Sequence, residues 1–162
     1  MMFAIIPNLT RKNAAQVTRL ICARLDELGA AYSLPLSTEN VFSDTKAEFL
    51  PEKELLGGCE AVITVGGDGT IIHSAKKAAV YSKPVLGINA GRLAFMAGLE
   101  IHELDLLEKL ITGDYSMDKR MMLKTTAADG DSVQSGYSMN DSTVMRLSRL
   151  SRISEINVDL DG

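Results

Sequence analysis

Short apolar runs, each stopped by a turn signal, recur along the first two thirds of the chain. Residues 3–6, 61–65 and 84–89 are apolar at nearly every position, which is typical of strands buried on both faces of a parallel sheet. Residues 31–34 form a similar run that stops at Pro35. We therefore expect a set of parallel strands in this part of the chain.

Apolar residues at helical spacing follow the first of these runs. Residues 17–28 place an apolar stripe on one helix face, with Thr10 expected as the N-terminal cap and Gly29 as the C-terminal cap. Residues 36–54 are polar and weakly patterned. We expect mostly connection there, with a short helix after Pro51.

Two further helices are expected later in the chain. One begins near Thr70 and should turn small or apolar side chains toward the sheet, namely Ile71, Ile72, Ala75, Ala78 and Ala79. The other covers residues 104–111 and ends at Gly113. The alternation of strands and helices predicts an α/β fold: an open, mostly parallel, Rossmann-like sheet with right-handed crossovers and helices on both faces.

The hydrophobic period changes at about residue 120. Residues 120–126 and 137–145 are predicted to be extended segments of a hairpin, joined through a turn at residues 129–131. Residues 154–161 alternate strictly between polar and apolar positions and predict another strand. The last part of the chain is therefore expected to be rich in β structure.

Composition and charge exclude several functions. The 162 residues carry a formal net charge of −4 with scattered basic residues, so nucleic acid is not expected as a partner. We find neither a signal peptide nor an apolar stretch long enough to span a membrane, so a cytoplasmic protein without a membrane partner is expected. Cys22 and Cys59 lack the spacing of metal ligands and are expected to be buried thiols in a reducing compartment.

The strongest chemical signal is the sequence Gly-Gly-Asp-Gly-Thr at residues 66–70, between a predicted strand and a predicted helix. Glycines allow backbone N–H groups to approach a ligand closely, and a helix N-terminus adds partial positive charge, so phosphate is the expected ligand. Asp68 would repel a phosphate unless it binds a metal, accepts a hydrogen bond or takes a proton from a group being phosphorylated. The alternative is a glycine-rich turn without function.

The spacing of these glycines fits neither of two well-known phosphate loops. There is no G-x-x-x-x-G-K-[ST], and residues 66–69 do not match G-x-G-x-x-G. Residues 89–92, Asn-Ala-Gly-Arg, follow the next predicted strand. Because ligands of open parallel sheets bind beyond the carboxyl ends of the strands, both segments are expected to line one crevice.

Four segments of the chain, in order, resemble the NAD kinase family, which is related by fold to diacylglycerol kinases and phosphofructokinases. They are residues 66–70, residues 87–96 (Gly-Ile-Asn-Ala-Gly-Arg-Leu-Ala-Phe-Met), residues 120–123 and the pair Asn140-Asp141. The second segment resembles NAD kinases in particular. Lipid kinases usually carry Asn-Glu soon after the loop, where this chain has Ile-His-Ser at residues 72–74. A lipid kinase and a non-catalytic nucleotide-binding module remain the alternatives.

The resemblance implies a reaction and a general base. Asp68 would activate the 2′-hydroxyl of the adenosine ribose of NAD for attack on the γ-phosphate of ATP or on polyphosphate, with Mg²⁺ bound to the donor. The loop residues that would hold the substrates are Gly66, Gly67, Asp68, Gly69 and Thr70. No residue is assigned as a protein ligand of the metal.

The resemblance also implies further binding residues. Asn140 and Asp141 would contact the ribose hydroxyls, although the family usually has Glu where this chain has the shorter Asp141. His73 would lie near the dinucleotide phosphates, Asn89 would face the crevice, and Arg152 would supply a basic group. Phe95, by contrast, is expected to pack in the core rather than cover a ring.

The resemblance also bears on domain organisation. We expect an α/β domain over residues 1–118, and over residues 119–162 the beginning of a β-rich domain with too few strands to close a sheet. Two later segments of the family, a Gly-Asp-Gly and a Thr-Pro-x-Gly-Ser-Thr-Ala-Tyr-like block, do not occur before Gly162. The chain is therefore expected to be a fragment or a shortened relative. Separately, a homo-oligomer, dimer or tetramer, is expected.

Overall fold

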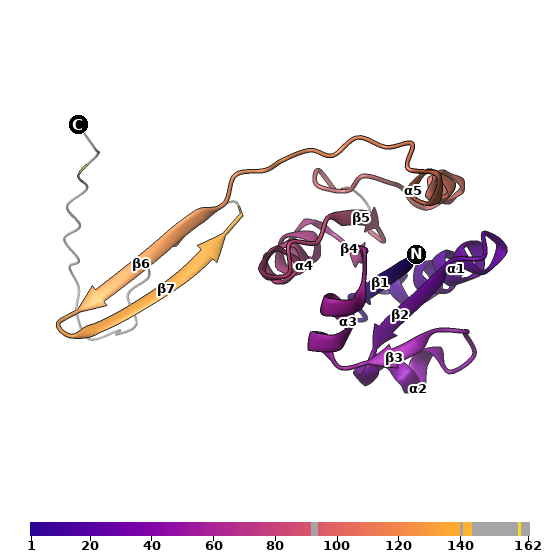
Figure 1. Cartoon of the computed structure of the whole chain (residues 1–162), viewed down its shortest axis with the longest axis horizontal. Helices are drawn as coiled ribbons and strands as arrows, with labels where there is room; N and C mark the ends of the chain where they lie inside the picture. The colour runs from indigo at the N-terminus through magenta and orange to yellow at the C-terminus, as the bar shows by residue number, and fades with distance from the viewer. Residues whose placement is uncertain (92–93, 140, 144–158, 160–162) are drawn as a thin grey trace.

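The core of the molecule is a parallel five-stranded sheet (Figure 1). The computed structural model describes residues 1–91, 94–139, 141–143 and Asp159. The strand order is β3-β2-β1-β4-β5, and all four pairings are parallel. The strands are β1 (Met2–Pro7), β2 (Ala31–Pro35), β3 (Glu48–Leu50), β4 (Ala61–Gly66) and β5 (Val85–Asn89). The predicted parallel α/β sheet is thus confirmed.

Side chains of the central strands alternate between two apolar layers, one on each face of the sheet. On one face, Phe3 and Ile5 of β1 and Ile63 of β4 pack with helix α1 (Ala14–Glu27). On the other, Ala4 and Val62 pack with Leu55 and Leu56 of helix α3 (Glu52–Gly58) and with Ala78 of helix α4 (Asp68–Val80). Burial on both faces explains why the sequences of these strands are unbroken apolar runs.

Helix α1 begins later than the sequence predicted. Asn13 occupies the N-cap position, and Thr10 instead forms a turn with Asn8, whose side-chain Oδ1 accepts hydrogen bonds from it. A local side-chain turn thus replaces the expected cap. At the other end, Gly29 has a φ of +67°, the left-handed conformation that favours glycine after a helix, as predicted.

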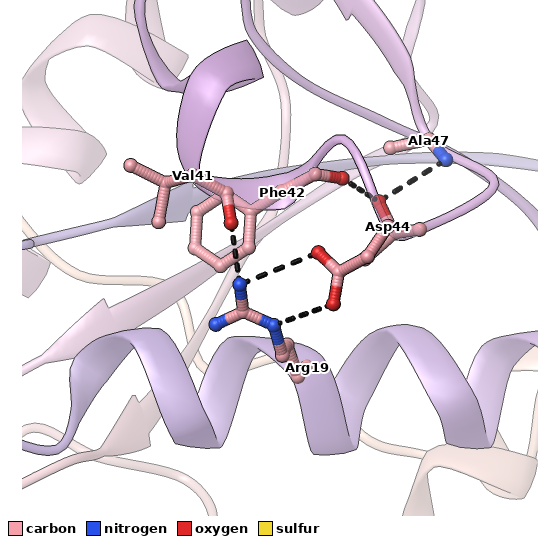
Figure 2. Close-up of polar contacts among 6 residues, drawn as sticks. Arg19, Val41, Phe42, Asp44 and Ala47 are labelled. Atoms are coloured by element: carbon pink, nitrogen blue, oxygen red, sulfur yellow. Dashed lines mark hydrogen bonds and ion pairs between the residues drawn. The ribbon is translucent and has the colours of Figure 1, made fainter.

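Residues 36–50 contain more structure than predicted. They form a 3₁₀ turn η1 (Leu36–Thr38), a one-turn helix α2 (Glu39–Phe42) and the edge strand β3, and α3 (Glu52–Gly58) follows Pro51 as expected. Figure 2 shows how Arg19 of α1 holds this segment, with its guanidinium bonded to the Asp44 carboxylate and to the Val41 carbonyl. The same guanidinium lies 5.2 Å from the centre of the buried Phe42 ring.

Helix α4 (Asp68–Val80) begins two residues before the predicted start at Thr70. Its inner face presents Ile71, Ser74 and Ala78, whereas Ala79, predicted to face the sheet, is exposed. The Ser74 hydroxyl lies 2.9 Å from the Thr64 hydroxyl of β4 in the core. Because this pair is buried and mutually hydrogen-bonded, it fixes α4 along the sheet without an unsatisfied polar group.

The helix predicted over residues 104–111 is divided in two. Residues Ile101–Leu107 form a 3₁₀ segment, η2, which begins with reciprocal side-chain to backbone bonds between Glu100 and Glu103. The α-helical part, α5, covers only Glu108–Thr112 and ends at Gly113, whose φ is +76°.

A two-stranded antiparallel hairpin follows an extended segment, residues 114–122 (Figure 1). Its strands are β6 (Leu123–Asp129) and β7 (Ser132–Ser138), so β7 begins before the predicted residue 137. Almost all of its side chains are exposed. Apart from Asp159, the strand predicted over 154–161 lies outside the described residues. In the described part of the chain no helix is long and apolar enough to cross a membrane.

Candidate active site

Three chain segments meet at the carboxyl edge of the sheet. Gly66, the last residue of β4, pairs with Asn89, the last residue of β5. On the other side of β4, the Asn8 N–H that follows β1 donates to the Val65 carbonyl at 2.9 Å. The glycine loop and the segment after Asn89 therefore lie side by side, as the sequence predicted.

The three glycines of the loop serve different purposes. A Cβ on Gly66 would lie 2.4 Å from the Thr70 Oγ1, so only glycine lets Thr70 fold back over the end of β4. Apart from the chain neighbours and the backbone of α4, a Cβ on Gly67 or on Gly69 would meet no atom of the described residues within 4 Å, and neither residue has a positive φ. The fold alone thus requires glycine at position 66 and leaves open space beside positions 67 and 69.

The loop leads directly into the N-terminus of α4. Gly67 is the N-cap residue, and its carbonyl accepts the first helical bonds, from the N–H groups of Thr70 and Ile71. The N–H groups before them have no partner within the helix. They carry the positive end of the helix dipole, which is a site suited to phosphate oxygens.

Asp68 is the first residue of α4 and connects the two segments of the site. Its carboxylate accepts a hydrogen bond from the Met96 N–H at 2.8 Å and another from the Phe95 N–H at 3.2 Å. The residue is half-buried. A carboxylate has more lone pairs than these two bonds occupy, so Asp68 can still accept the proton of a bound hydroxyl group.

Asn89 is oriented into the protein. It is 1% exposed, its Nδ2 lies 3.1 Å from both carboxylate oxygens of Glu100, and its Oδ1 accepts a bond from the Gly91 N–H at 2.8 Å. These contacts fold the segment after β5 back onto the strand, where Leu99 forms an isolated bridge with Ile88. In this structure the Asn89 amide therefore holds Gly91 and Glu100 in place, and the segment that carries them forms one wall of the site.

The expectation that Phe95 packs in the core is wrong, because its side chain is 83% exposed. The Phe95 N–H is bound by Asp68, and this holds the backbone at the open edge of the sheet. His73 is also exposed, one turn further along α4 than Gly69. Both side chains are accessible to a ligand.

The remaining predicted residues belong to the end of the chain. Asp141 is exposed, and its Oδ2 accepts a hydrogen bond from the Thr143 hydroxyl at 3.3 Å. Asn140 and Arg152 lie outside the described residues. The described contacts thus join the glycine loop to residues 89–91 and 95–100 and leave the role of the Asn140-Asp141 pair a prediction.

Sequence reasoning missed Asn8, whose Nδ2 donates to the Thr70 Oγ1 at 2.8 Å. The available signal was its position immediately after the central strand, where side chains of parallel sheets face the ligand edge. Arg11 and Lys12 follow in the same loop, are exposed, and form no ion pair with any described carboxylate. This edge therefore also carries positive charge.

Two surface hollows of the described chain lie away from the site, one beside Tyr32 and Lys46 and one beside Leu106 and Thr112, and neither includes a loop residue. Within residues 1–91, 94–139, 141–143 and 159, no group of three or more His, Cys, Asp or Glu side chains could hold a metal ion.

Comparison with known proteins gives one consistent family. A family model described as "ATP-NAD kinase N-terminal domain" matches residues 22–115. The NAD kinase of Chlorobium phaeovibrioides is 33% identical over 164 residues, covering 100% of this chain and 56% of that protein. The NAD kinase of Natranaerobius thermophilus is 31% identical and covers 98% of this chain and 55% of that protein.

A solved structure agrees in fold. Yeast NADH kinase complexed with NADH superposes with a TM-score of 0.74 at 19% identity, over 86% of this chain and 47% of that one. This chain spans about half the length of the curated relatives that match it from end to end. The matched family model and these relatives together show that the chain belongs to the NAD kinase family.

Proposed function

We propose that this chain supplies the phosphate loop and the general base of an NAD kinase, which transfers a phosphoryl group to the 2′-hydroxyl of the adenosine ribose of NAD and forms NADP. The observation that carries the proposal is the placement of Asp68. Its carboxylate lies at the first residue of α4 and is fixed by the N–H groups of Phe95 and Met96. Membership of the NAD kinase family supports the same substrate.

The glycine loop is proposed to bind the phosphate donor, ATP or polyphosphate. Open space beside Gly67 and Gly69 supports this role, since nothing in the described fold requires glycine there. A phosphate could approach the backbone N–H groups at the start of α4, where the dipole favours negative charge. Mg²⁺ would arrive bound to the donor phosphates and neutralise part of their charge.

Asp68 is proposed to accept the proton of the 2′-hydroxyl as the hydroxyl oxygen attacks the γ-phosphorus. A bond forms between these two atoms while the bond from phosphorus to the bridging oxygen of the donor breaks, and ADP or shortened polyphosphate leaves. A fixed carboxylate is suited to this step because a well-positioned base contributes about 10² to 10⁴ in rate.

The other predicted residues are proposed to bind NAD. Asn140 and Asp141 would hold the ribose hydroxyls, His73 would lie near the dinucleotide phosphates, and Arg152 would supply a basic group. Asn89 would hold the backbone of the segment that carries Phe95. The exposed Phe95 ring offers a flat apolar surface against which adenine could stack. We further propose a cytoplasmic homo-oligomer that uses small-molecule substrates only.

The test is NADP formation by the protein at its full natural length. We expect activity in the wild type and a loss of about a hundredfold or more in Asp68→Asn with the fold intact, because the amide cannot accept the proton. The matched control is Glu100→Gln, which loosens the same wall through Asn89 without touching the proposed base. Near-normal turnover of Asp68→Asn with an unchanged pH profile would show that Asp68 is not the base.

A further inference from the structure

Asn8 links the loop after β1 to the first turn of α4. Its Nδ2 donates to the Thr70 Oγ1 at 2.8 Å, and its Oδ1 accepts from the Thr10 N–H at 3.2 Å and the Thr10 hydroxyl at 2.7 Å. The backbone N–H of Thr10 can only donate, so the amide oxygen of Asn8 must face Thr10. The amide nitrogen must then face Thr70, and the direction of that hydrogen bond is fixed.

This direction determines what the Thr70 hydroxyl can do. Its oxygen is the acceptor of the Asn8 bond, so its own proton is available for another acceptor. Among the described residues, none accepts that proton. The side chain is also confined from the other side, because it lies directly over Gly66. Thr70 is therefore a fixed hydroxyl donor at the start of a helix.

We propose that Asn8 is a positioning residue for the phosphate donor: it holds the Thr70 hydroxyl so that its proton is donated to a phosphate oxygen. The surroundings favour an anion, since the α4 N-terminus lies at this site and the exposed cations Arg11 and Lys12, which form no ion pair with a described carboxylate, follow in the Asn8 loop. The inference rests on the proposed phosphoryl transfer and adds the residue that orients one of its donor contacts.

The test is a double-mutant cycle with Asn8→Ala, Thr70→Val and the double variant, each checked for cooperative thermal unfolding. If Asn8 acts through Thr70, each single change lowers kcat/KM for the phosphate donor about ten- to a hundredfold, the loss expected for one hydrogen bond to a charged group. The double variant is then no worse than Thr70→Val alone, and the KM for NAD is unchanged. Losses that multiply in the double variant would overturn the proposal.

Two further variants separate positioning from simple support of the loop. Thr10→Val removes one bond to Asn8 but leaves the Asn8 to Thr70 bond, so the kinetic constants should stay within about twofold of wild type. Asn8→Asp keeps both acceptor bonds to Thr10 but would draw the Thr70 proton to itself, so it should lose donor affinity as Asn8→Ala does. A loss in Thr10→Val equal to that in Asn8→Ala would contradict the proposal.

A binding measurement distinguishes this inference from the proposed function. Titration of inorganic tripolyphosphate into the same variants by calorimetry reports the phosphate contact without any transfer step. We expect weaker binding by Asn8→Ala and by Thr70→Val, with no further loss in the double variant. Absence of NADP formation with this binding pattern retained would contradict only the proposed function. NADP formation with independent effects of the two residues would contradict only the positioning role.

Discussion

Arg19 and Asp44 form the ion pair that holds residues 36–47 against α1, with 2.9 Å between the Arg19 Nε and the Asp44 Oδ2. The hydrogen bonds from Arg19 lower the pKa of the Asp44 carboxyl below its ordinary value of 3.8. A carboxyl group whose pKa is lower in the folded state stabilises that state above its unfolded pKa. The contribution is lost as the pH falls through the folded pKa.

We therefore predict that Asp44→Asn lowers the midpoint of thermal unfolding at pH 7, and that the difference from wild type vanishes well below pH 3.8. Circular dichroism melts at the two pH values measure this. Asp105→Asn is the matched control, because that carboxylate is 93% exposed and lies 3.7 Å from Arg24. An equal difference at both pH values would show that Asp44 acts through shape and not through charge.

Cys22 and Cys59 are buried free thiols, as the sequence predicted. Burial raises the pKa of Cys22 to about 12 and also raises the pKa of Cys59. Because the thiolate is the reactive form, we predict very slow reaction of the folded protein with a thiol reagent at pH 8, and rapid reaction in denaturant. Stoichiometric labelling of the folded protein at the rate of a free cysteine would contradict this burial.

At the scale of elements, the tight connection between β4 and α4 predicts that replacing Gly66 destabilises the fold. Gly66→Ala forces a Cβ to within 2.4 Å of the Thr70 Oγ1, so Thr70 must move. We expect a cost of about 1 to 3 kcal/mol in the free energy of unfolding, as for other overpacked sites. Denaturant melts measure it.

Gly69→Ala is the matched control in the same loop. Its Cβ meets no atom of the described residues within 4 Å beyond its chain neighbours and the helix backbone, so the fold should be unaffected or stabilised, by up to about 1 kcal/mol from the higher helix propensity of alanine. Its effect should appear as weaker binding of tripolyphosphate. Destabilisation equal to that of Gly66→Ala would mean that both glycines serve the fold.

The elements that sequence could predict are those whose burial follows a simple period. β1 and β4 are apolar on both faces, and α1 carries one apolar stripe, so their patterns identify them. β3 has only three residues, and α2 is a single turn held by the Arg19 network. Polar side-chain bonds between distant residues leave no period in a sequence, so this segment was predicted as connection.

The site was predictable to a similar degree. The glycines at positions 66, 67 and 69 predicted a loop at Asp68. The parallel order of the strands predicted that Asn89, at the end of the next strand, lies beside that loop. The bonds from the Asp68 carboxylate to the Phe95 and Met96 N–H groups join residues far apart in sequence and use backbone donors, which no residue type reveals. Because the Asp68 bond holds the Phe95 backbone at the open edge of the sheet, the Phe95 side chain is exposed although it is apolar, and residue type alone could not predict this.

At the scale of the whole molecule, every buried residue of the described chain lies between Phe3 and Leu107. We predict that residues 1–118, cut before the hairpin, unfold cooperatively at the same temperature as residues 1–162. Calorimetry of the two proteins measures this. Loss of a cooperative transition on removal of residues 119–162 would show that the hairpin stabilises the sheet.

The hairpin leads to a further prediction, because it exposes Leu123, Val133 and Tyr137. We predict that residues 1–162 alone associate as concentration rises and form no NADP, since a two-stranded hairpin cannot bury these side chains. Light scattering after gel filtration and a coupled NADP assay measure the two outcomes. Robust NADP formation by a monodisperse protein of residues 1–162 would contradict the prediction.

The position of β1 between β2 and β4 has a consequence for the order of events during protein synthesis. β1 leaves the ribosome before β4, yet its Phe3 pairs with Ala61 and its Pro7 with Val65. Closing so long a loop is slow and requires that residue 66 has already been translated. Until then the nascent chain carries an apolar strand with one side unpaired, which is the kind of segment that chaperones bind. Slowing translation before residue 61 should therefore lengthen its association with them.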